Sequence, residues 1–282
     1  MAFSPAIADA FAALFLDASS QSRIADLHFQ DAGHGFDAFG MHPSFVALGE
    51  VVLAPLYDKY FRVRSWGHEN IPSQGPAVLA ANHSGNIPID GMMLWLDVLR
   101  HTQPPRVARP IADHFVPSLP YLGTFFARGG MVGGSRGNAR TLLNSGEMLM
   151  IFPEGVPGIV KPWSKRYQLQ KFREGHAELA IRHQAPIVPI GVVGGEEQLP
   201  ALFSSRRIGK LFGLPIMPVP AVPIPLPVRY HLYYGEPIPV HEEFKPEHAD
   251  DPQAVKEVAA RVQEAVQRLV HQGLSERTGI FE

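Results

Sequence analysis

A histidine and an aspartate stand seven positions apart in residues 82–90, which read Asn-His-Ser-Gly-Asn-Ile-Pro-Ile-Asp. An imidazole whose tautomer is fixed by a carboxylate can take a proton through its other ring nitrogen. His83 and Asp90 could therefore let a hydroxyl attack a thioester directly, with no covalent acyl-enzyme. Taken alone, the segment has an equally good second explanation. Asp90 could simply be an acidic residue that the helix dipole favours at a helix start, and His83 an ordinary, partly buried histidine.

The flanking residues predict the two elements that would bring this pair together. Residues 76–82 are expected to form a strand that ends at the histidine. Pro88 is well placed as the first residue of a helix, so Asp90 falls in the first turn of that helix. The glycine and the proline between them let the chain fold back, and the imidazole can then meet the carboxylate.

Strand-like and helix-like patterns alternate along the rest of the chain. Residues up to about 18 are expected to form a short amphipathic helix, and residues 21–41 a loop-rich segment. Further strands are expected at 61–66, 107–112, 149–152, 187–193 and 229–234, and helices at 45–61 (kinked at Pro55), 92–100, 176–183 and 255–270, with one ending at 141–146. This alternation predicts the α/β class, a sheet covered by helices.

The composition limits the classes of protein and the kinds of chemistry that are compatible with this chain. The chain has 282 residues, 45% of them hydrophobic and 18% charged, which suits one globular unit with a full-size core. With 25 basic against 27 acidic residues it lacks the basic face of a nucleic-acid binder, so no nucleic-acid partner is expected. The chain has no cysteine, and its 13 histidines lack metal-binding spacing, so neither a metal nor another cofactor is expected.

Several further sequence motifs, arranged in order along the chain, indicate a function for the histidine and the aspartate. Residues 82–90 resemble the catalytic motif of the glycerolipid acyltransferase superfamily, the 1-acylglycerol-3-phosphate acyltransferases and their relatives. Later blocks match in order at 125–130 (Phe-Phe-Ala-Arg-Gly-Gly), 152–155 (Phe-Pro-Glu-Gly), 171–175 and 186–190, so the resemblance spans roughly residues 60–235. It implies a mixed, largely parallel central sheet covered by helices. It also implies an O-acyltransferase, with His83 as general base oriented by Asp90.

The resemblance also implies substrate contacts. Glu154 and Gly155 match a block whose glutamate and glycine help hold the acceptor, since a carboxylate accepts from a hydroxyl and glycine permits close approach. Arg128 stands where a phosphate-contacting arginine is expected, and is a candidate to bind an acceptor head group or a donor phosphate. A solvated glutamate at a strand corner and an exposed surface arginine are the alternatives.

Two departures from the superfamily pattern concern the acceptor. Six residues separate His83 from Asp90, where most members have four, and this form resembles a branch near the diacylglycerol-forming enzymes. Val156 and Pro157 stand where threonine and arginine are usual, so an obvious phosphate clamp is missing. The expected reaction is transfer of an acyl group from acyl-CoA or acyl carrier protein to a lipid hydroxyl, with lysophosphatidic acid a less favoured acceptor.

Residues 133–137 (Gly-Gly-Ser-Arg-Gly) suggest a different enzyme. They fit the nucleophile elbow of α/β-hydrolases, which needs a strand before it and a helix after it. An esterase would use Ser135 as nucleophile with a later acid and base such as Asp251 and His271. Ser135 also fits the N-cap of the next helix, and free amides around it and Arg136 could hold an anion.

A membrane surface is the remaining expected partner. Residues 211–227 contain no charged residue, and their prolines forbid a spanning helix. They are expected to form an apolar flap that roofs an acyl groove or enters the membrane interface, with a buried connector as the alternative. Arg206, Arg207 and Lys210 just before it could meet anionic head groups. A non-catalytic lipid-binding module remains a further possibility.

The expected organisation is an N-terminal helix and loop segment, residues 1–44, followed by an acyltransferase domain, residues 45–282. The N-terminal helix is a candidate second membrane contact. The apolar start of the chain lacks a basic leader and is interrupted by Asp9 and Asp17, so neither a signal peptide nor a transmembrane helix is expected. We therefore expect a cytoplasmic protein that is peripherally associated with the membrane.

Overall fold

A seven-stranded sheet forms the centre of the computed structural model, which describes residues 4–84, 88–113, 115–211 and 216–282. Its strands, in spatial order, are β1 (Arg64–Trp66), β9 (His231–Tyr234), β6 (Ile187–Val193), β2 (Ala77–Ala81), β5 (Met148–Ile151), β3 (Ala108–Ala112) and β4 (Val132–Gly133). Neighbouring strands are parallel except for β6 and β9. The predicted α/β class with a mixed, largely parallel sheet is confirmed.

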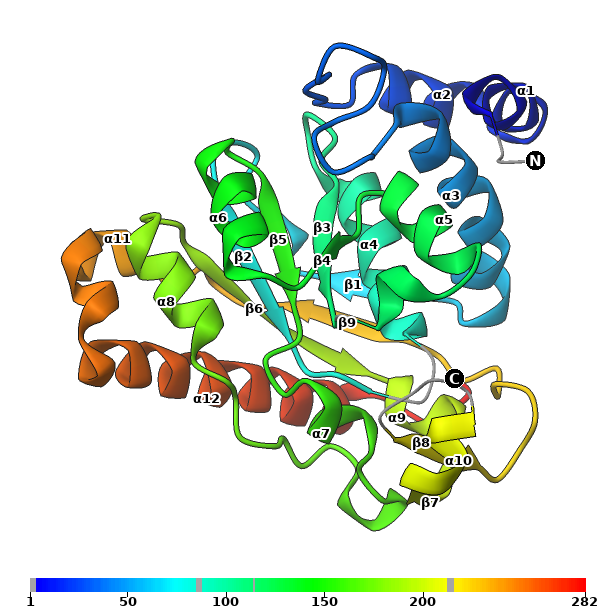
Figure 1. The fold of residues 1–282 in the computed structure, drawn as a ribbon. Coiled ribbons are helices and arrows are strands. Elements are labelled where there is room, and N and C mark those ends of the chain that lie inside the picture. The colour runs from blue at the N-terminus through cyan, green and yellow to red at the C-terminus, as the bar shows by residue number, and fades with distance from the viewer. Residues whose placement is uncertain (1–3, 85–87, 114, 212–215) are drawn as a thin grey trace.

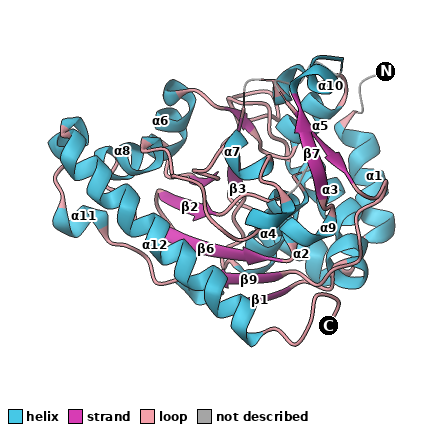
Figure 2. Ribbon diagram, turned by 90° about the horizontal axis from the view of Figure 1, so that it is seen from below, coloured by secondary structure: helices cyan, strands magenta, loops and turns pink. Residues whose placement is uncertain are grey.

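Helices cover both faces of this sheet (Figures 1 and 2). The long helices are α1 (Pro5–Phe15), α2 (Ala18–Ala25), α3 (Pro43–Pro55), α4 (Ile89–His101), α5 (Leu122–Arg128), α6 (Arg136–Asn144), α8 (Gly175–Arg182) and α12 (Pro252–Glu276). Four short helices complete the set: α7 (Val156–Ile159), α9 (Gly195–Gln198), α10 (Arg206–Leu211) and α11 (Val240–Glu243). Two large apolar clusters result, one shared with α3 and α4, the other with α6, α8 and α12. A third, small cluster joins α1 to α3.

Strand β2 contributes to both clusters because side chains alternate across a strand. Leu79 belongs to the cluster on the α4 side, whereas Val78 and Ala80 belong to the cluster on the α12 side. All five residues of β2 are buried, as the near-continuous apolar run of a parallel strand predicts. Since β5 and β6 flank β2 in the same direction, the carboxyl ends of the three strands meet at one edge, where ligands bind in such sheets.

The N-terminal part contains one helix more than the sequence indicated. Helix α2 lies in the segment expected to be loop-rich, and Asp17 caps it by accepting a hydrogen bond from the Ser20 amide at 2.8 Å. Arg23 on α2 pairs with the fully buried Glu50 of α3 at 2.8 Å. Helix α3 continues after Pro55 as one π-helical turn, residues 56–60, at the predicted kink.

Part of the proline-rich segment, residues 217–220, pairs as a β-strand. Strands β7 (Ala201–Ser205) and β8 (Met217–Pro220) form a second, antiparallel sheet, and residues 212–215 lie outside the described residues. Farther on, the Tyr60 hydroxyl donates to the Pro225 carbonyl at 2.6 Å, which fastens this part to the core, while Ile224 stays 68% exposed. Within the described ranges, no helix has the length and apolar character needed to cross a bilayer.

Candidate active site

The end of β2 and the start of α4 bring His83 and Asp90 into contact. Nδ1 of His83 lies 2.8 Å from Oδ2 of Asp90, and the aspartate is fully buried in the first turn of α4. Pro88 is the N-cap of α4 rather than its first residue, and residues 85–87, where the chain was expected to fold back, lie outside the described residues. The predicted meeting of strand end and helix start is therefore present.

Asp90 is held by backbone and side-chain donors besides the histidine. Its Oδ2 also accepts from the amide of Ser84 at 2.8 Å and from the Ser84 hydroxyl at 3.2 Å, and its Oδ1 accepts from the Gly91 amide at 2.8 Å. With these donors on its oxygens, Asp90 also accepts from Nδ1–H of His83, so Nε2 is the nitrogen with a free lone pair.

The histidine ring is fixed from two other directions. It stacks on Phe152 with 4.3 Å between ring centroids, and 12% of its side chain is exposed. The preceding Asn82 exchanges two hydrogen bonds with the backbone of Val192 in β6, at 2.9 and 2.7 Å. The imidazole is thus held at the sheet edge with a small part of its surface accessible, as a base that meets a substrate requires.

Glu154 lies beside this pair but faces inward. The side chain is fully buried, Oε1 accepts from the His83 amide at 3.0 Å, and Oε2 accepts from the Gln170 amide at 2.7 Å. Both oxygens are therefore engaged by the protein, which differs from the expected contact with a substrate hydroxyl. Gly155 has φ 59° and ψ −148°, a conformation nearly restricted to glycine, and the Arg173 guanidinium lies against it.

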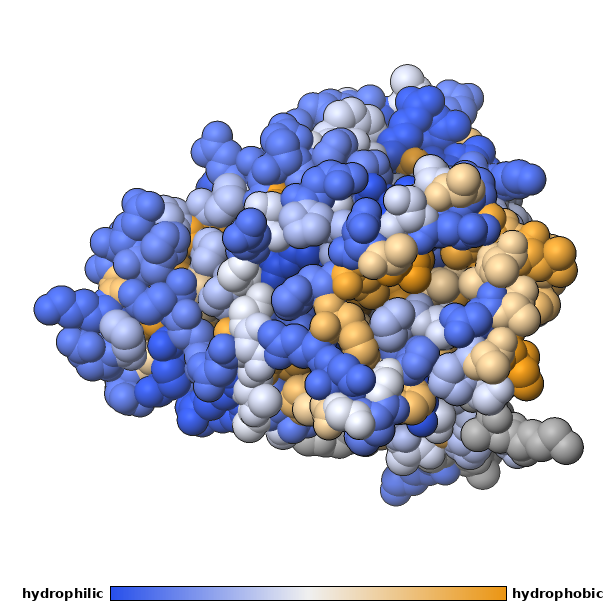
Figure 3. All heavy atoms as spheres, turned by 90° about the horizontal axis from the view of Figure 1, so that it is seen from above, coloured by the Kyte–Doolittle hydropathy of each residue, from blue (hydrophilic) through white to orange (hydrophobic). Residues whose placement is uncertain are grey.

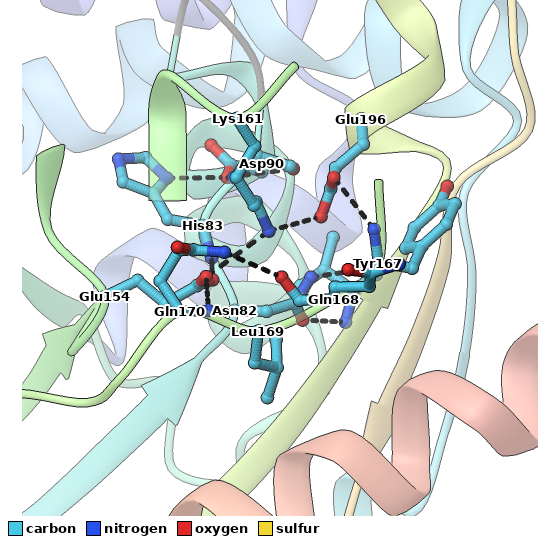
Figure 4. Close-up of polar contacts among 12 residues, drawn as sticks. Asn82, His83, Asp90, Glu154, Lys161, Tyr167, Gln168, Leu169, Gln170 and Glu196 are labelled. Atoms are coloured by element: carbon cyan, nitrogen blue, oxygen red, sulfur yellow. Dashed lines mark hydrogen bonds and ion pairs between the residues drawn. The ribbon is translucent and has the colours of Figure 1, made fainter. Parts of the chain in front are cut away.

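Sequence reasoning missed two charged residues at this site. Lys161 places its Nζ 2.8 Å from Oε1 of Glu196 and 3.3 Å from Oε2 of Glu154 (Figure 4). Burial raises the pKa of Glu196, and the Lys161 ammonium opposes that rise. A single lysine between apolar residues and prolines, in Ile-Val-Lys-Pro-Trp, was the one signal in the sequence. Such a residue is almost never fully buried unless it is paired.

A surface pocket of about 410 Å³ opens next to this cluster. Its lining is largely apolar with a few basic groups: Val156, Pro157, Val160, Lys161, Pro162, Lys165, Gln170, Arg206 and Ile216. Lys161 and Gln170 belong both to the pocket wall and to the contacts of Glu154. The pocket therefore adjoins the residues that hold the backbone of His83. Within the described part of the chain, no group of histidine, aspartate or glutamate residues could hold a metal ion.

Arg128 is engaged with the N-terminal segment. It donates from Nη1 to the Gly40 carbonyl at 3.2 Å, and its guanidinium lies 4.0 Å from the centre of the Phe36 ring. The structure thus gives Arg128 a role in fastening residues 36–40 to α5.

Ser135 is the N-cap of α6, as expected, and its hydroxyl accepts from the Asn138 amide at 3.1 Å. Arg136 is the first, exposed residue of that helix. The proposed esterase partners do not meet: Asp251 caps the start of α12, and His271 lies near the end of the same helix. A helix rises 1.5 Å per residue, so roughly 30 Å separates them. The expected triad of Ser135, Asp251 and His271 is therefore wrong.

Fold and site together define a class of protein. A buried aspartate orients a histidine at the carboxyl edge of a largely parallel sheet, and a glutamate from the Phe-Pro-Glu-Gly block holds the same histidine from its backbone. The contact of the histidine with the aspartate is the one that the resemblance to the glycerolipid acyltransferases implied, whereas the contact of the glutamate with the histidine backbone is an addition to it.

Comparison with known proteins agrees. The family described as Acyltransferase matches residues 62–193. An uncharacterized protein of Mycobacterium tuberculosis is 36% identical over 258 residues, which cover 88% of this chain and 72% of the relative. The Homo sapiens protein named DGAT1/2-independent enzyme synthesizing storage lipids is 30% identical over 205 residues, which cover 72% of this chain and 59% of that protein.

A solved structure shares the fold. The 1-acyl-sn-glycerophosphate (LPA) acyltransferase PlsC from Thermotoga maritima matches with a TM-score of 0.52 and 19% sequence identity, over 82% of this chain and 83% of that one. The chain belongs to the glycerolipid acyltransferase superfamily, as its sequence blocks predicted, and it is a lipid acyltransferase.

Proposed function

We propose that the protein transfers a fatty acyl group from acyl-CoA or acyl carrier protein to a hydroxyl of a glycerolipid. The observation that carries this proposal is the 2.8 Å contact between Nδ1 of His83 and Oδ2 of Asp90, which leaves Nε2 as the basic nitrogen. Val156 and Pro157 in place of a threonine and an arginine support an acceptor without a phosphate. The Homo sapiens relative is named as an enzyme synthesizing storage lipids, which supports the same acceptor class.

The reaction follows from the free nitrogen of the imidazole. Nε2 of His83 takes the proton of the acceptor hydroxyl while its oxygen attacks the thioester carbonyl carbon. The carbon–sulfur bond then breaks, and the proton passes from the imidazolium to the leaving thiolate. The products are a lipid ester and a free thiol. Asp90 stabilises the imidazolium that forms between the two steps.

One pair of variants tests this mechanism. Purified protein is given oleoyl-CoA with vesicles containing monooleoylglycerol, dioleoylglycerol or lysophosphatidic acid, and both free thiol and esterified lipid are measured. His83→Ala should lower kcat by about 10² to 10⁴ because the general base is lost. Ser135→Ala, which removes only a helix cap, should keep most of the activity. Covalent labelling of Ser135 by a serine-hydrolase probe, or a fully active His83→Ala variant, would contradict the proposal.

We propose further that the protein reaches its lipid at a membrane surface through α1. Four apolar side chains on α1 are exposed, namely Ile7, Phe11, Leu14 and Phe15, and Leu14 has 75% of its surface in water. Figure 3 shows apolar side chains gathered toward one side of the molecule in the view from above. An exposed apolar patch of this kind suits an interfacial helix.

Vesicle flotation tests this contact. Phe11→Glu with Leu14→Glu should reduce the fraction of protein that floats with phosphatidylcholine and phosphatidylglycerol vesicles, because two charges would enter the interface. Phe281→Glu, at another exposed aromatic residue, is the matched control and should float as the unaltered protein does. Equal flotation of all three proteins would refute the contact.

A further inference from the structure

Lys161 lies between two buried carboxylates. The proposed acyl-transfer reaction does not use this lysine directly. Its side chain is only 4% exposed, and its Nζ contacts Glu196 at 2.8 Å and Glu154 at 3.3 Å. It follows the short helix α7, whereas Glu154 precedes α7 and Glu196 belongs to α9. Figure 4 shows the ammonium between the two carboxylates, with His83 and Asp90 beside them.

Each carboxylate in turn holds a backbone amide. Glu154 accepts from the His83 amide at 3.0 Å, and Glu196 accepts from the Tyr167 amide at 2.9 Å. Glu154 also accepts from the Gln170 amide at 2.7 Å. The ammonium of Lys161 therefore compensates the charge of both carboxylates. One of them, Glu154, holds the strand end that carries His83, and both hold the segment that lines the adjacent pocket.

Without the cation these two buried carboxylates would lose the group that balances their charge. Breaking a buried ion pair by removing one partner leaves an uncompensated charge and is strongly destabilising. Glu154 would then turn away from Glu196, although each of its two oxygens accepts from a backbone amide. The His83 amide would lose its acceptor, and the strand end would shift.

We propose that Lys161 is a positioning residue for His83. The inference rests on the proposed function and adds that the ammonium keeps the Glu154 side chain in place, so that Oε1 holds the His83 amide and the ring stays aligned with Asp90. The lysine touches neither substrate nor the reacting atoms in this role. Its effect reaches the imidazole through Glu154, with Glu196 as the second partner of the same ammonium.

Steady-state kinetics of substituted proteins test this role. In the assay with oleoyl-CoA and dioleoylglycerol vesicles, Lys161→Met should lower kcat by about tenfold to a hundredfold, because a small misplacement of the base is costly. KM for oleoyl-CoA should change little. Lys161→Arg, which keeps the charge, should retain more activity than Lys161→Met.

A double variant separates positioning from general stability. Lys161→Met with Glu196→Gln removes the cation together with one carboxylate, so its kcat should lie between those of the unaltered protein and Lys161→Met. If Lys161→Met does not fold, the double variant decides the question in its place. Lys256→Met, an exposed lysine on α12, is the control and should keep the original kcat.

The outcomes distinguish this inference from the proposed function. A folded Lys161→Met protein, or its double-variant substitute, with an unchanged kcat would overturn the role of Lys161, while His83-dependent transfer would still stand. Absence of His83-dependent thiol release in the unaltered protein would overturn the proposed function itself. A reduced kcat that neither Lys161→Arg nor the added Glu196→Gln partly restores would show a merely structural lysine and also refute the inference.

Discussion

Asp90 uses its two oxygens for different purposes. Oδ2 accepts from His83 and Ser84, and Oδ1 accepts from the Gly91 amide at the start of α4. An amide side chain has only one acceptor atom, so it cannot reproduce this set. Turned one way it presents its NH₂ to the Gly91 amide, and turned the other way it presents NH₂ to both the Ser84 amide and Nδ1–H of His83.

Asp90→Asn should therefore be harmful in either orientation. We expect kcat to fall by about 10² to 10⁴ because the tautomer of His83 is no longer fixed. The free energy of unfolding should fall by about 1 to 3 kcal/mol because one buried donor loses its acceptor. Thiol release and urea unfolding measure the two effects. Asp58→Asn, at an exposed aspartate, is the control, and an equal kcat for both variants would contradict the assignment.

At the level of single residues, the sequence predicted contacts that depend on local geometry. His83 and Asp90 are close in the chain, and the strand end and helix start between which they lie could be read from residue types. The inward orientation of Glu154 could not, because it depends on Gln170 and Lys161, whose arrangement is set by tertiary packing. The contact of Arg128 with the Gly40 carbonyl could not be predicted either, because Gly40 is far away in the sequence.

At the level of elements, buried strands and amphipathic helices were the most predictable parts. Strands β2, β5 and β6 follow apolar runs, and α12 follows an apolar stripe, so both patterns match their elements closely. Helix α2 was missed because its sequence is polar and short, and its stability comes from the Asp17 cap and the Arg23 contact with Glu50. The β7–β8 pairing was missed because proline is unusual in strands.

One close approach between elements could not be read from the sequence. Gly195 on α9 faces the Ser84 side chain so closely that a Cβ at that position would lie 2.0 Å from the Ser84 hydroxyl oxygen. That hydroxyl donates to Asp90. The glycine is therefore required by packing of α9 against the end of β2, and this contact couples α9 to the His83 site.

The whole molecule has a pH-dependent stability that is independent of its active site. His176 on α8 is buried, and burial lowers its pKa from 6.5 to about 4. Between these two values the unfolded chain binds a proton that the folded protein does not, so stability falls as pH falls from 6.5 toward 4. At pH 5 this one residue costs about 2 kcal/mol relative to pH 8.

His176→Leu should flatten this dependence. At pH 8 the variant should be less stable by about 1 kcal/mol, because the contact of Nδ1 with the Arg173 carbonyl is lost. Between pH 8 and pH 5 the variant should lose less stability than the unaltered protein, which urea unfolding at both pH values measures. Burial also lowers the pKa of His231 to about 4. His231 is present in both proteins, so it contributes equally to both pH profiles. Parallel pH profiles would show that His176 does not contribute.

The order of strands in the central sheet also constrains how the protein is made. Strand β9 lies between β1 and β6, and Asn82 is hydrogen-bonded to Val192. These elements of the N-terminal half therefore pair with residues that are synthesised much later. While the chain emerges from the ribosome, β1 has no neighbour and the His83 segment has nothing to hold it. Non-local pairing of this kind folds slowly and exposes strand edges to aggregation. Catalytic competence is thus acquired only when nearly the whole polypeptide is available, and N-terminal fragments should be inactive and poorly soluble.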